Sequence, residues 1–170
     1  MKNIILIGFM GVGKGTIARA YAAEFDAYAI DTDDLIESME NRKIKDIFKD
    51  EGEPYFRALE QKSAKWLSKS VKNSIISTGG GFFKTKSLKK IGIVVLLDSS
   101  YHAILKRILE HPNAKRKLAK RPLFQDPKQA KKLYKERSTE YKEVADLIIN
   151  VEDKTPQQIA KELKKLVTKL

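Results

Sequence analysis

A glycine-rich loop that directly follows a short apolar run constrains this chain more than any other stretch. Residues 3–7 carry no charge and are mostly branched aliphatic, which predicts a strand buried on both faces. The sequence Gly-Phe-Met-Gly-Val-Gly-Lys-Gly-Thr follows over residues 8–16, and a helical period starts within it. Glycine amides and a helix N-terminus attract phosphate oxygens, and a lysine adds a full positive charge. This context favours a phosphate-binding loop over a plain turn with a surface lysine.

The loop departs from the usual pattern at one position. GxxxxGK is normally followed by Ser or Thr, whose hydroxyl ligates Mg²⁺. Here Gly15 follows Lys14, and Thr16 comes one residue late. Phosphate binding depends on backbone amides and on the lysine, so the departure bears on the metal ligand and not on the phosphates. The residues expected to bind the nucleotide phosphates are Gly11, Val12, Gly13, Lys14, Gly15 and Thr16.

Composition narrows the class of protein. The 170 residues suit one compact domain, and 34 Lys and Arg against 22 Asp and Glu give a net charge of +12 that attracts nucleotides, acidic metabolites or nucleic acid. The chain has no cysteine and two histidines, so any metal should have oxygen ligands. The apolar runs are too short for a signal peptide or a membrane span, which predicts a cytoplasmic protein.

Five short apolar runs alternate with segments of helical period. This alternation predicts an α/β fold, with a five-stranded parallel sheet flanked by helices in a single domain over residues 1–170. The longest helical segment has a break at residues 51–54, where Gly and Pro stand close together. The predicted strands are residues 3–7, 28–30, 74–77, 93–97 and 147–151.

Acidic residues follow the second predicted strand. Ligands bind at the carboxyl ends of parallel strands, where Asp31 and Asp33 would lie. Their spacing places both on one side of an extended backbone, so one could serve Mg²⁺ and the other a substrate hydroxyl. The alternative is capping of the next helix by Thr32 or Asp33, and the two roles can coexist.

The residues alone allow more than one interpretation of two further patterns. Three consecutive glycines, residues 79–81, follow the third strand and indicate either close approach by a ligand or by backbone, or a plain loop. Arg57 and Glu60 are three residues apart on a helix and can pair. Such a pair, taken alone, is typical of ordinary helix surface.

Asp98 ends the fourth predicted strand. An acid after an apolar strand is also found in the second acidic motif of phosphate-loop enzymes, which holds Mg²⁺. The segment 98–100 precedes a helix as well, so N-capping by Asp98 is the alternative.

A polar and basic stretch covers residues 112–126 and contains Arg121. It has the character of a mobile lid that excludes water and brings a cation to the reacting phosphate. A solvated basic loop or a nucleic-acid patch are the alternatives. Phe124 is the single aromatic residue there, which weakens the nucleic-acid interpretation because base stacking needs several.

Seven short motifs follow one another along nearly the whole chain: GFMGxGK at 8–14, DTD at 31–33, IF at 47–48, FRxxE at 56–60, STGGG at 77–81, RPLF at 121–124, and ER with a later Tyr at 136–141. In order and spacing, these motifs resemble those of the shikimate kinase family. The resemblance implies a P-loop kinase of the nucleoside-monophosphate-kinase type, with a substrate-binding helical segment at about residues 32–62 and a lid at about 112–126. It implies transfer of the γ-phosphate of ATP to the 3-hydroxyl of shikimate, in aromatic amino-acid biosynthesis.

The resemblance implies a role for each matching residue. Asp33 would accept or orient the hydroxyl proton, and Lys14 and Arg121 would complete the catalytic set. Asp31 would serve Mg²⁺, Arg121 would also close from the lid onto ATP, and the acid at the end of the fourth strand would revert to a helix cap. Because Gly15 stands where the family usually has Ser or Thr, the remaining metal contact would pass through water or shift to Thr16. The residues implied to hold shikimate are Asp33, Arg57, Gly79, Gly80, Gly81 and Arg137.

Two rival functions remain. The Gly15-Thr16 pair suggests a gluconate-type or nucleotide kinase on the same fold, although DTD, FRxxE and the triple glycine argue against it. The charge of +12 suggests a nucleotide-dependent nucleic-acid-binding protein. We expect a monomer that uses Mg²⁺ and ATP and binds neither nucleic acid nor membrane. The candidates for the adenine side are Arg107, Arg116 and Pro156.

Overall fold

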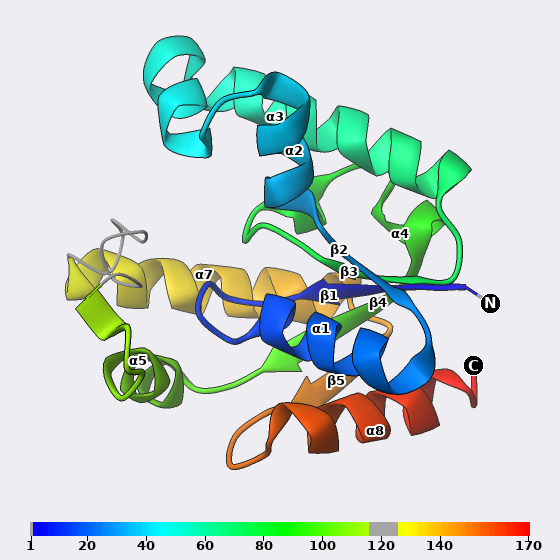
Figure 1. The fold of residues 1–170 in the computed structure, drawn as a ribbon. Helices are drawn as coiled ribbons and strands as arrows, with labels where there is room; N and C mark the ends of the chain where they lie inside the picture. The colour runs from blue at the N-terminus through cyan, green and yellow to red at the C-terminus, as the bar shows by residue number, and fades with distance from the viewer. Residues whose placement is uncertain (1, 116–125) are drawn as a thin grey trace.

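Five parallel strands run through the centre of the molecule in the order β2-β3-β1-β4-β5 (Figure 1). This computed structural model describes residues 2–115 and 126–170. The predicted α/β fold with a five-stranded parallel sheet is confirmed. The strands are β1 (Asn3–Ile7), β2 (Tyr28–Asp31), β3 (Ser74–Ser77), β4 (Gly92–Asp98) and β5 (Leu147–Asn150).

The central strand β1 explains why its sequence is a continuous apolar run. All five of its residues are buried. β3 pairs along one edge of β1 and β4 along the other, and both faces of an inner strand in a parallel sheet are covered by packed elements. Ile4 lies in register with Ile75 and with Ile93. The loop that follows β1 therefore emerges between the carboxyl ends of two neighbouring strands, where open α/β sheets bind ligands.

Helices cover the sheet and also extend beyond it. Helices α1 and α8 pack against each other, α3 packs on α4, and α7 contacts β4. In Figure 1, α2 and α3 project away from the sheet as a separate upper part of the molecule. No helix within residues 2–115 and 126–170 has the length and apolar character needed to cross a membrane. The helices are α1 (Lys14–Phe25), α2 (Thr32–Glu40), α3 (Ile44–Ser70), α4 (Leu88–Ile91), α5 (Tyr101–Leu109), α7 (Pro127–Val144) and α8 (Pro156–Val167), with a 3-10 turn η1 (Phe82–Lys84).

The break predicted inside the long helical segment is confirmed. Gly52 has φ 81° and ψ 176°, so α3 consists of two helical parts that meet at this residue, with Pro54 just beyond it. The rings of Phe48 and Phe56 lie 4.7 Å apart across the break. This upper part of the molecule has a small apolar core of its own, separate from the main core, formed by Ile36, Ile47, Phe56 and Leu59.

Candidate active site

The loop after β1 adopts backbone angles that glycine reaches without strain. Gly8, Gly11 and Gly13 have φ values of 139°, 85° and 103°. A Cβ on Gly8 would lie 2.7 Å from the carbonyl oxygen of Leu97, so a side chain there would collide with β4. Backbone angles of this kind are typical of phosphate-binding loops, which hold anions by their amides.

Two cationic side chains hold this loop. The Lys14 side chain is buried, and its Nζ donates to the carbonyl oxygens of Gly8 at 2.7 Å and Phe9 at 3.2 Å. Nη1 of Arg107, from α5, donates to the carbonyl oxygen of Val12 at 2.7 Å. Burial lowers the pKa of the Arg107 guanidinium. The adenine-side candidate Arg107 therefore contacts the phosphate loop itself.

Oxygen atoms from two strand ends face Gly15. Asp31 and Ser77 lie in register at the ends of β2 and β3. A Cβ on Gly15 would lie 3.7 Å from Asp31 Oδ2 and 3.7 Å from Ser77 Oγ, which is ordinary van der Waals contact. Thr16, which the sequence offered as a substitute ligand, is exposed. Ser77 is a hydroxyl that we did not predict as a ligand, although its place at a strand end beside the loop was a usable signal.

Asp31 caps α2, so the alternative interpretation, in which Thr32 or Asp33 provides the cap, is wrong. Asp31 has extended backbone angles, and its Oδ1 accepts from two amides of the first helical turn at 2.9 and 3.4 Å. Thr32 instead accepts through Oγ1 from the amide of Gly79 at 3.1 Å. Because the cap uses Oδ1 of Asp31, its Oδ2 can serve another ligand.

Each glycine of residues 79–81 packs against a different functional side chain. A Cβ on the first would lie 2.6 Å from Asp33 Oδ1, and a Cβ on the second would lie 3.0 Å from Arg137 Nη1. A Cβ on the third would overlap the guanidinium of Arg57. Tyr141 donates to the carbonyl oxygen of the second glycine at 2.7 Å, which fixes the loop. Close approach, and not a plain loop, therefore explains the three glycines.

Arg57 forms two ion pairs, one of them buried. Its Nη1 lies 2.6 Å from Glu60 Oε2, and its Nη2 lies 2.7 Å from Glu53 Oε1. The Glu60 side chain is 2% exposed, so the surface-pair interpretation is wrong for Glu60. Oε1 of Glu60 and Oδ1 of Asp33 are buried without a hydrogen-bond partner in the described part of the chain. Two unpartnered acceptors indicate a ligand that carries hydroxyl donors.

The Asp33 carboxyl has a raised pKa, mainly because it is buried. Burial raises the pKa of the Asp33 carboxyl to about 7, and the negative charges of Asp31 and Glu60 add to the rise while Lys14 opposes it. Burial also raises the pKa of Glu60, although its hydrogen bond with Arg57 opposes that rise. A carboxyl that titrates near neutral pH is suited to accept a proton from a substrate hydroxyl.

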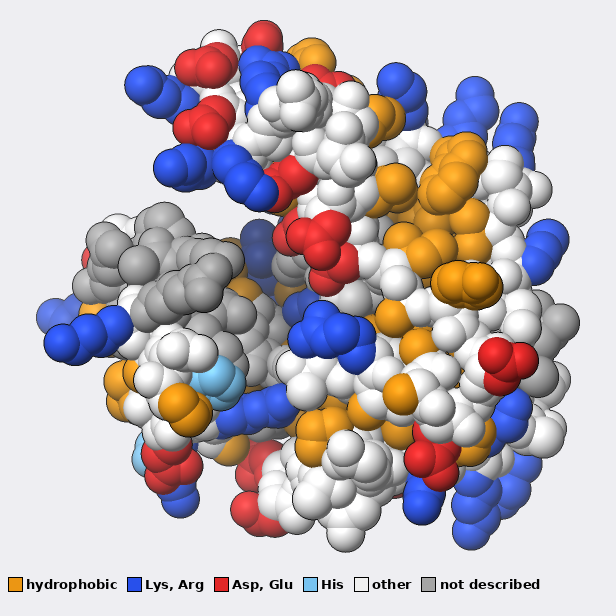
Figure 2. All heavy atoms as spheres, in the orientation of Figure 1, with side chains coloured by type: hydrophobic (Ala, Val, Ile, Leu, Met, Phe, Trp, Pro, Cys, Tyr) orange, Lys and Arg blue, Asp and Glu red, His pale blue; other side chains and the backbone are white. Residues whose placement is uncertain are grey.

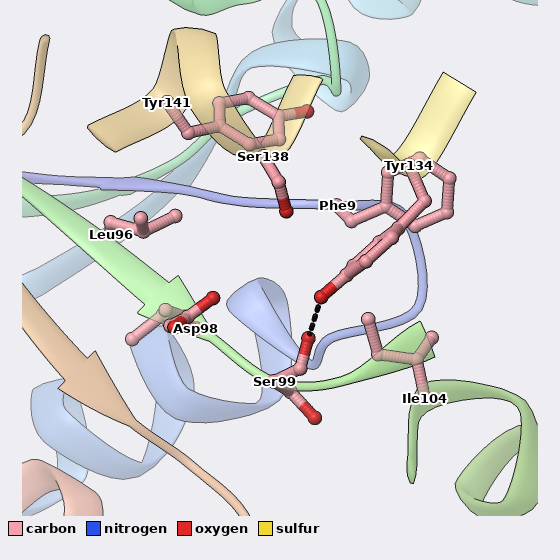
Figure 3. Close-up of a pocket in the computed structure, with 9 residues that line it drawn as sticks. Phe9, Leu96, Asp98, Ser99, Ile104, Tyr134, Ser138 and Tyr141 are labelled. Atoms are coloured by element: carbon pink, nitrogen blue, oxygen red, sulfur yellow. Dashed lines mark hydrogen bonds between the residues drawn. The ribbon is translucent and has the colours of Figure 1, made fainter. Parts of the chain in front are cut away.

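Asp98 lies beside the phosphate loop, at a small cavity of about 10 Å³ between β4 and α7 that Phe9 and Ser138 also line (Figure 3). The N-cap of α5 is Ser100, whose Oγ accepts from the amide of Ala103 at 3.2 Å. The predicted helix-cap role of Asp98 is therefore wrong.

Figure 2 shows the surface hollowed beneath the part of the molecule formed by α2 and α3, with Lys and Arg side chains exposed there. Arg121 and most of the predicted lid, residues 116–125, lie outside the described residues. Within residues 2–115 and 126–170, no group of three or more His, Cys, Asp or Glu side chains could hold a metal ion by itself.

Known proteins share the sequence and the fold. A shikimate kinase family model matches residues 10–168. A shikimate kinase of Helicobacter hepaticus is 43% identical over 150 residues, covering 88% of this chain and 87% of its own length. One from Sulfurihydrogenibium sp. is 40% identical over 168 residues, covering 96% of each chain. The chain belongs to the shikimate kinase family.

Solved structures of shikimate kinases have the same fold. The enzyme of Acinetobacter baumannii, in complex with shikimate, superimposes with a TM-score of 0.79 at 30% identity and covers 99% of this chain and 94% of its own. The enzyme of Aquifex aeolicus superimposes with a TM-score of 0.78 at 33% identity, with 98% and 96% covered. These matches confirm the resemblance drawn from the ordered motifs, and they confirm the P-loop kinase fold of the nucleoside-monophosphate-kinase type.

Proposed function

We propose that this shikimate kinase family member transfers the γ-phosphate of ATP to the 3-hydroxyl of shikimate, giving ADP and shikimate 3-phosphate. The observation that supports it best is the convergence of Asp33, Arg57 and Arg137 on residues 79–81, beside the phosphate loop. One acid and two arginines are the groups that a carboxylated triol needs. The carboxylate needs cations, and the reacting hydroxyl needs an acceptor for its proton.

The donor half of the site holds the triphosphate. The amides of residues 11–15 and the ammonium of Lys14 would bind the phosphate oxygens, and Arg107 holds the loop by its bond to Val12. Because this arrangement is built before ATP arrives, little reorganisation is needed when charge develops on the transferred group. Arg121 would add a cation from the lid.

The acceptor half orients shikimate and takes up the proton. The planar guanidinium groups of Arg57 and Arg137 would bind the carboxylate in bidentate fashion. The 3-hydroxyl oxygen then forms a bond to the γ-phosphorus while the bond from phosphorus to the bridging oxygen of ADP breaks. The hydroxyl proton passes to the unpartnered Oδ1 of Asp33. With a pKa of about 7, the Asp33 carboxyl can hold this proton and release it to water in each cycle.

The residues around Gly15 fit a hydrated Mg²⁺ ion. Mg²⁺ keeps several waters and takes one or two protein oxygens, and Asp31 Oδ2 and Ser77 Oγ both face the gap above Gly15. Bound there, Mg²⁺ would offset the negative charge of the β- and γ-phosphates. Thr16 could provide its hydroxyl to Mg²⁺ only from an exposed position in the first turn of α1.

An ADP-release assay across four conditions tests the proposal. Protein, ATP and Mg²⁺ would be combined with shikimate, gluconate, AMP or no acceptor. We expect ADP release that depends on shikimate and a product whose mass is greater by one phosphate. Turnover with gluconate or AMP alone would show that the acceptor is wrong.

We further propose a cytoplasmic monomer that acts without nucleic acid. Light scattering after size-exclusion chromatography tests the oligomeric state. Binding of RNA or DNA at physiological salt, with a steep loss of affinity as salt rises, would favour the nucleic-acid rival instead.

A further inference from the structure

A second cavity lies at the amino ends of the strands, at the opposite end of the sheet from the active site. It has a volume of about 490 Å³ and is bordered by the first residues of β1 and β4, including Asn3 and Gly92. In Figure 1 the N-terminus leads into β1 at this end of the sheet, and the C-terminus lies near it. Since β1 has five residues and strands rise about 3.3 Å per residue, the cavity is separated from the phosphate loop by roughly 16 Å of strand.

The lining of this cavity carries a local excess of positive charge. Lys2, Lys72, Lys89 and Lys90 border it, and Asp146 is its acidic side chain. Both oxygens of Asp146 are already engaged, because Oδ1 binds Lys89 Nζ at 2.5 Å and Oδ2 accepts from an amide of β4 at 2.8 Å. The other three lysines have no carboxylate partner among residues 2–115 and 126–170.

The backbone that carries these three lysines is fixed by one buried side chain. Asn3 is 2% exposed, and its Nδ2 donates to the carbonyl oxygens of Val71 at 2.8 Å and Ile91 at 3.1 Å. Lys2 precedes Asn3, Lys72 follows Val71, and Lys90 precedes Ile91. Three exposed lysines from three separate segments, Lys2, Lys72 and Lys90, thus border one cavity, and the backbone beside each of them is held by Asn3.

We propose that this cavity binds a small anion carrying two or more phosphate groups. Lysine ammonium groups are compact charges that suit phosphate oxygens, and the volume is that of a metabolite site. No aromatic side chain among residues 2–115 and 126–170 lines the cavity, so none of these residues stacks on a nucleobase there. The chemistry therefore favours a polyphosphate or a bisphosphate of a small metabolite over a nucleotide or nucleic acid.

Tripolyphosphate is the probe that tests the proposal. The protein would first be saturated with ADP and shikimate in the absence of Mg²⁺, so that the cations of the active site are occupied. Backbone amide resonances are then followed by NMR at constant ionic strength. We expect saturable shifts at Gly92 and Ile93, at the cavity, and none at Gly13 and Gly15.

Matched variants distinguish binding at a specific site from a general effect of positive charge. Lys72→Ser with Lys90→Ser should weaken tripolyphosphate binding by about tenfold or more. Lys62→Ser with Lys65→Ser removes the same charge from exposed positions on α3 and should change binding less than about twofold. Equal effects of the two pairs, shifts that do not saturate, or shifts confined to the phosphate loop would overturn the proposal. So would tighter binding of a single-stranded RNA at the same amides. None of these readouts depends on phosphotransferase activity.

Discussion

Arg57 Nη1 lies 2.6 Å from Oε2 of Glu60, a carboxylate that is 2% exposed. The buried acid therefore holds the guanidinium against residues 79–81, where we place the carboxylate of shikimate. The exposed partner Glu53 binds the outer side of the same guanidinium. The two pairs look alike in sequence, but burial makes the first the stronger constraint on Arg57.

Glu60→Gln should raise the KM for shikimate by about tenfold, with a smaller change in kcat, because Arg57 loses its buried anchor. Steady-state kinetics with varied shikimate measure this. Glu53→Gln is the matched control, since Glu53 is 63% exposed and pairs with the same arginine. It should change KM less than about twofold. Equal effects of the two substitutions would contradict the anchoring role of Glu60.

The stability of the ligand-free protein should fall as pH rises through the titration of Asp33. The carboxyl has a folded-state pKa of about 7 against an unfolded value of 3.8, so the folded state holds the proton more tightly. Its unfavourable contribution grows from about pH 4 and levels off above about pH 7. Asp33→Asn should therefore raise the free energy of unfolding by roughly 2–4 kcal/mol more at about pH 8 than at about pH 4. Urea unfolding measures this, and a difference independent of pH would argue against the raised pKa.

Gly79→Ala should lower kcat by about 100-fold while the protein still folds. The added Cβ would lie 2.6 Å from Asp33 Oδ1, so the carboxylate must move from its position, and small displacements of reacting groups have effects of this size. Turnover numbers measure the loss of activity, and circular dichroism checks that the protein still folds. A kcat within about threefold of wild type would mean that Asp33 tolerates displacement.

Gly15→Ser should tighten binding of a divalent ion to the ADP complex. The serine Cβ fits at 3.7 Å from both Asp31 Oδ2 and Ser77 Oγ, and its hydroxyl would add a ligand. Electron paramagnetic resonance of Mn²⁺ measures the affinity, with several-fold tightening expected. Gly15→Ala, which adds the Cβ without the hydroxyl, should bring no gain. Weaker Mn²⁺ binding by a folded Gly15→Ser protein would mean that the glycine is required for steric reasons.

The sheet and the site could be predicted from sequence where a local pattern determines the structure. The run at residues 3–7 is typical of a strand buried on both faces, and Gly52 with Pro54 is typical of a break in a helix; the structure has both. The roles of Asp33 and Arg57 came from ordered motifs, and the structure places both at residues 79–81. No pattern predicted the short α4 helix, which has four residues.

The sequence predictions of helix caps failed where two or three neighbouring residues have similar chemistry. Asp31 caps α2 although Thr32 and Asp33 are equally good capping residues, because the choice depends on where the backbone leaves β2. Ser100 caps α5 in place of Asp98 for the same reason. The burial of Glu60 depends on how α3 packs over a distant loop, which no local pattern contains.

Phosphate transfer in a single turnover is the sharpest test of the role of Asp33. Excess enzyme with Mg²⁺ and labelled ATP is mixed with shikimate, and shikimate phosphate is measured over time in wild type and in Asp33→Asn. We expect the variant to bind shikimate with an affinity within several-fold of wild type and to transfer phosphate at least about 100-fold more slowly. Transfer at close to the wild-type rate would contradict the placement of the reacting hydroxyl at Asp33.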